Sequence, residues 1–110
     1  MTPEIRQALQ QGIVAHRKGN FREAERLYRV VLKSYPKNAD ACHNLGLLAI
    51  AANKPAVALP LFKTALDANR TVEQYWVSYI TALIKEDIGW CLFNQGEVEP
   101  ARPILKKHLQ

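Results

Sequence analysis

Apolar residues recur at three- and four-residue steps through most of this chain, with polar residues between them. Residues 39–66 show this pattern within one short stretch. Two apolar stripes are separated there by Asn53-Lys54-Pro55, and a proline suits the first turn of a new helix. This spacing predicts two short amphipathic helices joined by a turn. A single hairpin of this kind cannot bury both apolar faces, so we expect further hairpins to pack against it.

The same arrangement is found again when the chain is compared with itself at an offset of 34 residues. Small and aromatic residues then coincide, and each falls where the two helices of a hairpin would approach closely. The coinciding pairs are Gly12 with Gly46, Ala24 with Ala58, Tyr28 with Phe62 and Val31 with Ala65. A period of 34 residues per helix-turn-helix unit is the length of a tetratricopeptide repeat.

The run Asn44-Leu45-Gly46, the coinciding positions above and Pro36 resemble the signature of the tetratricopeptide repeat family. This resemblance implies an all-α solenoid of helical hairpins, with two regular repeats and an irregular third that contains a long helix. We expect a single domain. Its boundaries are residues 1–110, with repeats at about 4–37 and about 38–71 and the irregular repeat at about 72–110.

Residues at the predicted helix ends fit the hairpin plan. Side chains that accept hydrogen bonds from free backbone amides are favoured at helix starts, and glycine is favoured just past helix ends. The expected caps and stops are Thr2 before the first helix, Gly19 after it, Asn20 with Glu23 as a capping box for the second, Asn38 or Asp40 before the third, and Thr71 with Gln74 before the fifth.

The third unit departs from the repeat because no turn follows its first helix at the expected distance. A turn-like stretch arrives about nine residues late. We therefore predict one long helix over residues 72–94; the alternative is a break at residues 86–89. The second half of a long helix would bury Ile88, Leu92 and Phe93, which predicts a homodimer in which a second subunit covers them. Alternatively, the last hairpin folds back on its own chain.

In the tetratricopeptide pattern, the first helix of each unit lines a concave face. The resemblance therefore implies a mixed apolar groove with basic ends, suited to an extended peptide or an amphipathic helix of a protein partner. The residues expected to line it are Arg6, Leu9, Ile13, His16 and Arg17 in the first unit, Asp40, His43, Leu47 and Ile50 in the second, and Gln74, Val77 and Thr81 in the third. The alternative is that the C-terminal half of the chain covers part of this surface.

The net charge of +5 is concentrated near the N-terminus. Residues 1–38 contain eight Lys and Arg against three Asp and Glu, and the rest of the chain is neutral overall. Arg22, Arg26, Arg29 and Lys33 form a basic stripe along the second helix. The alternative function is therefore a basic surface that binds nucleic acid or an acidic partner. No aromatic residues interleave with the stripe for base stacking, so we expect a solvated helix face and no nucleic-acid partner.

The sequence contains no motif for catalysis or for a bound cofactor. It has no glycine-rich phosphate loop, no paired histidines of a metal motif and no nucleophile with an evident base. His16, His43 and Asp40 could approach one another across adjacent helices, but a surface histidine pair is far more often without a metal. Cys42 and Cys91 fit small core positions. We expect no enzyme activity, no cofactor and no metal.

No apolar run is long enough to span a membrane, and the N-terminal residues lack the plan of a signal peptide. We therefore expect a cytoplasmic protein without a membrane partner. Residues 71–85 resemble the repeats found ahead of the catalytic domains of bacterial multidomain glycosyltransferases. That resemblance implies a bacterial docking or assembly module without a transferase domain. The sequence thus predicts a non-catalytic scaffold for protein–protein interaction.

Overall fold

The structure is a computed structural model that describes residues 1–85 of the chain. Helices make up almost all of this range, and it contains no strand. The helices are α1 (Pro3–Arg17), α2 (Phe21–Ser34), α3 (Ala39–Ala51), α4 (Pro55–Ala68) and α5 (Glu73–Lys85). The fold is the all-α helical-hairpin solenoid predicted from the sequence.

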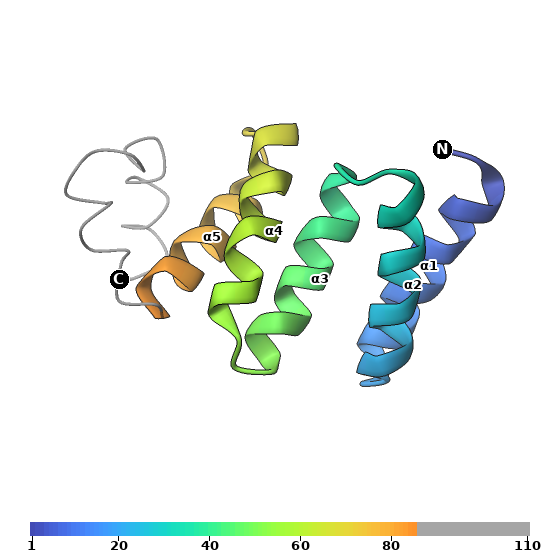
Figure 1. Cartoon of the computed structure of the whole chain (residues 1–110), viewed down its shortest axis with the longest axis horizontal. Helices are drawn as coiled ribbons and strands as arrows, with labels where there is room; N and C mark the ends of the chain where they lie inside the picture. Colours follow the sequence, from blue (N-terminus) through green and yellow to red (C-terminus); the bar gives the residue numbers. More distant parts are fainter. Residues whose placement is uncertain (86–110) are drawn as a thin grey trace.

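Successive helices run antiparallel and form a single row of hairpins (Figure 1). α1 packs on α2 and α3 packs on α4, while α2 contacts α3 and α4 contacts α5. In Figure 1, α2 and α4 stand towards the viewer, and α1 and α5 lie behind them. The second helices therefore share one side of the row, and the two outer first helices share the other.

The two complete hairpins turn with the same backbone geometry at equivalent positions. The first residue past the helix cap has a positive φ in each case, 79° at Gly19 and 58° at Asn53. In both turns, this residue and the next donate their backbone N–H groups back into the last turn of the helix, at 2.8 to 3.0 Å. These bonds close a Schellman motif, for which glycine is favoured and asparagine is the usual substitute. The predicted stop at Gly19 is confirmed.

Three helix starts are capped by the side chains that the sequence indicated. Thr2, Asn20 and Asn38 each accept a hydrogen bond from the backbone N–H three residues later, at 3.3, 3.4 and 2.9 Å. Asn38, and not Asp40, therefore caps α3. The capping box at Asn20 forms in one direction only, because the Asn20 N–H is already bonded in the preceding turn and the Glu23 carboxylate bonds to an arginine.

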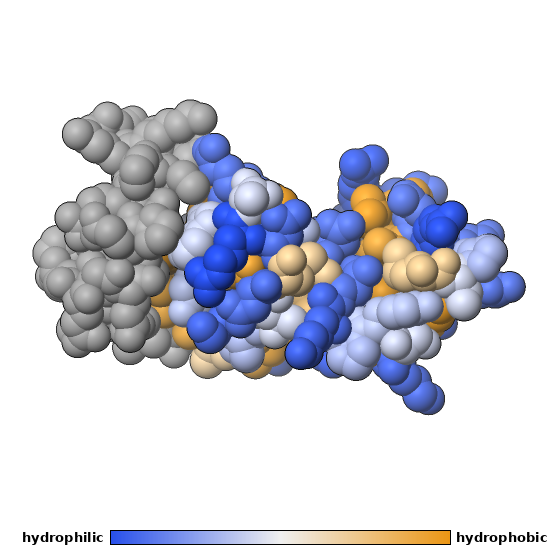
Figure 2. Space-filling view, turned by 90° about the horizontal axis from the view of Figure 1, so that it is seen from above, coloured by the Kyte–Doolittle hydropathy of each residue, from blue (hydrophilic) through white to orange (hydrophobic). Residues whose placement is uncertain are grey.

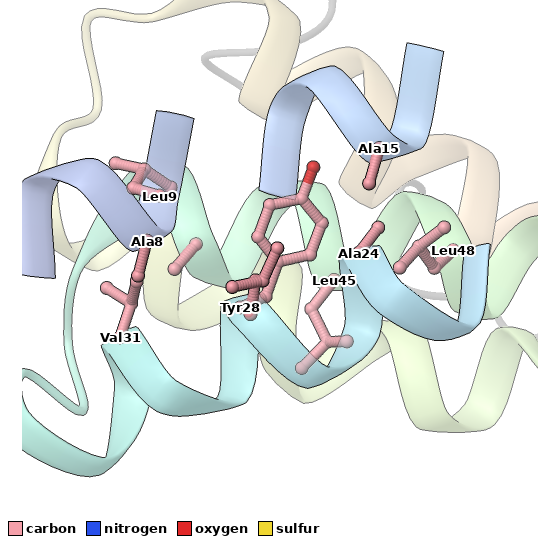
Figure 3. Close-up of a cluster of buried hydrophobic side chains, with 10 residues drawn as sticks. Ala8, Leu9, Ala15, Ala24, Tyr28, Val31, Leu45 and Leu48 are labelled. Carbon is pink, nitrogen blue, oxygen red and sulfur yellow. The ribbon is translucent and has the colours of Figure 1, made fainter. Parts of the chain in front are cut away.

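Each complete hairpin is closed by an aromatic ring lying against a glycine. A Cβ atom on Gly12 would lie 2.8 Å from Cε1 of Tyr28, and one on Gly46 would come closer still to the Phe62 ring. Both rings are fully buried. Figure 3 shows Tyr28 among the buried side chains that α1, α2 and α3 contribute to one cluster. The coincidence of glycine and aromatic positions in the sequence therefore reflects a close helix–helix contact.

α5 begins in the frame predicted for the third unit. The predicted cap of Thr71 with Gln74 is wrong, because α5 begins at Glu73 and the Thr71 hydroxyl donates to Oδ1 of Asn69 at 2.6 Å. Trp76 Nε1 on α5 donates to the Arg70 carbonyl at 2.8 Å, which ties the helix to the preceding loop. The Arg70 guanidinium lies 5.7 Å from the centroid of the same indole ring. The Trp76 side chain thus anchors α5 to the loop that follows α4, through one hydrogen bond to the backbone and one contact with the Arg70 guanidinium.

Part of the sequence prediction falls outside the described residues. This applies to the distal part of the long helix over 72–94, to the alternative break at 86–89, and to the dimer residues Ile88, Leu92 and Phe93. Among the helices of residues 1–85, none combines the length and the apolar character needed to cross a membrane.

Candidate partner-binding face

α1, α3 and α5, the first helices of the three units, carry the residues predicted to line a groove. Figure 2 views the molecule along its helices, and the described part is indented on the side of α1 and α5. Hydrophobic surface borders this indentation. We call this side the first-helix face. Apart from His16, which is half-buried beside the Tyr28 hydroxyl, the groove residues predicted on it fall into a buried pair, a partly exposed apolar set and an exposed polar set.

The buried pair consists of Leu9 on α1 and His43 on α3, which are equivalent positions in the repeat. Their side chains are 5% and 7% exposed. They form the floor of the face and support the residues around them. Contact with a partner therefore depends on the other predicted residues.

The partly exposed apolar set spans all three helices. Ile13 packs against the cluster formed by α1, α2 and α3, and Leu47 and Ile50 pack against the cluster around Phe62. Val77 on α5 is also half-buried. These side chains are held in place from below and still present apolar surface to the outside.

The exposed polar set lies around these apolar residues. It comprises Arg6, Arg17, Asp40, Gln74 and Thr81. Within residues 1–85, neither arginine has a carboxylate partner, whereas the Thr81 hydroxyl is bonded within its own helix. The α1 end of the face therefore carries positive charge that a partner can neutralise.

Two side-chain hydrogen bonds connect α3 to α5. His43 Nε2 lies 2.8 Å from Ser78 Oγ, and the Tyr75 hydroxyl donates to Oδ1 of Asp40 at 3.0 Å. The members of each pair are 35 residues apart, so the same contact is made twice, one helical turn apart. We call these four residues the α3–α5 clasp. Within the described chain, no side-chain hydrogen bond joins α1 to α3.

The His43 ring is enclosed by aromatic neighbours. Its centroid lies 5.5 Å from that of Phe62 and 4.8 Å from that of Tyr75. Burial lowers the pKa of His43, and the nearby Asp40 carboxylate opposes this effect. A buried neutral imidazole needs a hydrogen-bond partner, and Ser78 supplies it. The ring is therefore a structural element of the α3–α5 seam.

Tyr75 is the donor in the second bond of the clasp. Burial, with a further contribution from its hydrogen bond to the Asp40 carboxylate, raises the pKa of Tyr75 to about 12. The phenol therefore keeps its proton at neutral pH. It acts as a fixed donor that holds Asp40 at the edge of the face.

Sequence reasoning missed Tyr75 and Ser78 as partners of α3. The signal that could have found them is a polar pair separated by one repeat plus one residue, because that spacing brings neighbouring first helices together. One unit earlier, the corresponding pairs are Arg6 with Ala41 and Leu9 with Asn44. Alanine and leucine have no polar side-chain atom, so the clasp is specific to the α3–α5 seam.

His16 and His43 are hydrogen-bonded to different helices and not to each other. His16 Nδ1 lies 3.2 Å from the Tyr28 hydroxyl, whereas His43 is bonded to α5. Burial lowers the pKa of His16. No cluster of three metal-binding side chains occurs in residues 1–85. Cys42 is buried, and burial raises the pKa of its thiol; Cys91 lies outside the described part.

The basic stripe lies exposed along α2, as predicted from the sequence. Arg26 forms two hydrogen bonds to the Glu23 carboxylate, which lower the pKa of Glu23. Arg29 is paired with Glu25 at 3.2 Å. The other two members, Arg22 and Lys33, have no carboxylate partner within the described residues. Half of the stripe is thus locally neutralised, which weakens its attraction for a polyanion.

Comparison with known proteins gives one family. A family model described as Tetratricopeptide repeat matches residues 9–69 and, in a second placement, residues 43–110. The second match begins 34 residues after the first, which is the repeat period of the sequence. A search of curated proteins found no match to this chain.

Proposed function

Because the chain belongs to the tetratricopeptide repeat family, whose repeats mediate protein–protein interaction, we propose that it binds a peptide segment of a protein partner on its first-helix face. The observation that carries this proposal is the apolar set Ile13, Leu47, Ile50 and Val77. These side chains keep exposed surface on one side of consecutive hairpins, although the core beneath them is already filled. The function is non-catalytic.

The charges around the apolar set indicate the chemistry of the partner segment. Arg6 and Arg17 supply unpaired positive charge at the α1 end, and Gln74 supplies an exposed amide on α5. The segment therefore carries apolar side chains for the centre of the face and a carboxylate for its α1 end. It lies across α1, α3 and α5.

Selection from a displayed library of random peptides tests this proposal. Enriched peptides should combine apolar and acidic residues, and their binding should be lost in Leu47→Glu and retained in Val14→Glu. The second variant is a matched control because Val14 is also an exposed hydrophobic residue, 47% accessible, but is not among the groove residues. Circular dichroism confirms that both variants remain helical. Equal binding by the two variants would refute the first-helix face as the site.

We also propose that the protein self-associates as a homodimer through Ile88, Leu92 and Phe93. The support is the sequence pattern of a third unit that lacks its expected turn. Light scattering on serially diluted protein should show a dimer mass that Leu92→Glu converts to a monomer mass. A monomer mass for the unchanged protein at every concentration would rule out the dimer.

The wider setting is a proposal from the sequence alone. The likeness of residues 71–85 to repeats of bacterial glycosyltransferases supports a docking or assembly module of a bacterial cytoplasm. On this proposal the basic stripe is a solvated helix face. No transferase activity is expected from the chain.

A further inference from the structure

A second hollow lies between α2 and α4, the second helices, which stand towards the viewer in Figure 1. It is a groove of about 430 Å³ with α2 and α4 as its walls and α3 as its floor. Leu45, Leu48 and Ala49 of α3 form an apolar floor. The volume is within the range of sites that take up a bulky side chain or a small ligand. We call it the α2–α4 groove.

Two large hydrophobic residues stand exposed at the walls of this groove. Phe21 at the start of α2 is 48% accessible, and Val57 on α4 is 49% accessible. The repeat does not require either residue, because Phe21 corresponds to Pro55 in the second unit and Val57 corresponds to Glu23 in the first. Exposed apolar residues around a hollow are typical of interaction sites.

The rim of the groove is positively charged. Arg22 on α2 and Lys54 in the turn before α4 both line it, and neither has a carboxylate partner within residues 1–85. The one acidic residue of the lining, Glu25, is already paired with Arg29. The free charge at this apolar groove is therefore positive on both walls.

We propose that the α2–α4 groove docks an acidic peptide segment of a protein partner. One aromatic or aliphatic side chain of the segment enters between Phe21 and Val57 and rests on the floor of α3. Flanking carboxylates of the segment pair with Arg22 and Lys54. This site is separate from the first-helix face, and it does not depend on a partner bound there.

The charge and the apolar floor together favour this occupant over two others. A second copy of the chain brings its own net charge of +5 to a positive rim. The phosphates of a duplex nucleic acid can pair with the positive charges of the rim, but its phosphate backbone has no apolar group to contact the floor. An acidic peptide with one bulky apolar residue matches both features.

Two synthetic peptides, used with the full chain, provide the test. The first has one tryptophan flanked by glutamates, and the second has lysines in place of the glutamates. Fluorescence anisotropy should show binding of the acidic peptide only, weakened by added salt. Amide chemical shifts in ¹⁵N-labelled protein should change at Lys54, Val57 and Leu61, and those at Leu47 should stay constant.

Matched variants separate the groove from general charge. Val57→Glu should weaken binding by at least about tenfold, since it places a carboxylate against an acidic ligand in the apolar mouth. Val14→Glu, an equal change at an equally exposed valine, should leave binding unaltered. Arg22→Gln should weaken binding up to about fivefold, as expected for one exposed ion pair. Lys33→Gln, which removes a charge from the same helix outside the groove, should have no effect.

Each contrary outcome refutes the proposal in a recognisable way. Equal losses in Arg22→Gln and Lys33→Gln, with displacement of the peptide by a short duplex DNA, would identify a general polyanion surface. A dimer mass abolished by Val57→Glu would identify a second copy of the chain as the occupant. Chemical-shift changes centred on Leu47 would show that the peptide binds to the first-helix face, which would leave the function proposed above intact.

Discussion

The first and second hairpins have the same frame but surround their central ring differently. In both, a glycine of the first helix lies against an aromatic residue of the second. In the first hairpin, the Tyr28 hydroxyl lies against His16. In the second, Phe62 has no hydroxyl and Ile50 occupies the position equivalent to His16. The comparison shows that the repeat fixes the helix–helix contact, while the polar groups around the ring vary in matched pairs.

The largest difference between the hairpins is expected at their glycines. Gly46→Ala should destabilise the protein by about 1–3 kcal/mol, because the new Cβ overlaps the buried Phe62 ring. Gly12→Ala should cost less, since its Cβ would lie farther from Tyr28, and at both sites alanine regains about 1 kcal/mol of helix propensity. Urea unfolding of the two variants measures the difference. Equal free energies of unfolding would contradict the unequal closeness of the two contacts.

Exchange of the rings should be asymmetric. Phe62→Tyr should destabilise the protein by about 1–3 kcal/mol, because the added hydroxyl is buried beside Ile50 without a partner. Tyr28→Phe should cost about 1 kcal/mol or less, since it removes one hydrogen bond to the half-buried His16. The double variant Phe62→Tyr with Ile50→His should recover part of the loss, as measured by urea unfolding. An absence of recovery would show that the ring environment is not transferable between hairpins.

Acid should weaken both hairpins through their histidines, and the second hairpin more strongly. Burial lowers the pKa of His43 and of His16, so the unfolded chain binds more protons than the folded chain. The stability from each neutral ring is complete above the unfolded pKa of about 6.5 and is lost as the pH falls towards the folded pKa.

Unfolding free energies measured across this pH window separate the two contributions. The decrease in unfolding free energy on acidification should be reduced most in the double variant His43→Leu with Ser78→Ala. His43→Leu gives α3 the residue that α1 has at the equivalent position, Leu9, and Ser78→Ala avoids an unpaired hydroxyl. His16→Ile should reduce that decrease less, because His16 is the less buried ring. An unchanged slope in both variants would assign the acid sensitivity to other groups.

Effects of opposite sign are expected at the two helix stops. Asn53→Gly should stabilise the protein by about 0.5–1 kcal/mol, because glycine accepts a positive φ without strain. Gly19→Ala should destabilise it by about 1–2 kcal/mol for the same reason. Thermal unfolding monitored by circular dichroism resolves both changes. A loss of stability in Asn53→Gly would point to a role for the asparagine side chain in that turn.

Much of this fold could be predicted from local features of the sequence. The caps at Thr2 and Asn38, the stop at Gly19 and the glycine–aromatic contacts all depend on residues within one hairpin. The clasp partners of α3 could not be recognised in the same way, because Tyr75 and Ser78 belong to the next unit. The burial of His43 depends on Tyr75 and Phe62 together, so a search for exposed groove residues placed it on the surface.

For the partner-binding residues too, features within one hairpin differ from features formed between hairpins. The resemblance to the repeat family placed Ile13, Leu47 and Val77 on first helices as groove residues; they are half-buried there, and their role in binding stays a prediction. The α2–α4 groove was not predicted, since Phe21 and Val57 come from different hairpins and line one groove only when the units stack. A repeat pattern therefore predicts what units share and overlooks what arises between them.

The α3–α5 clasp has a mechanical consequence. Two directional bonds resist sliding and rotation between the second and third units. The first and second units meet through an apolar cluster that α1, α2 and α3 share, and no side-chain hydrogen bond joins α1 to α3 in the described chain. The stack is thus stiffer towards α5 than towards α1. A ligand lying across the first-helix face would contact a rigidly held α5 on one side and, on the other, an α1 that can adjust its tilt.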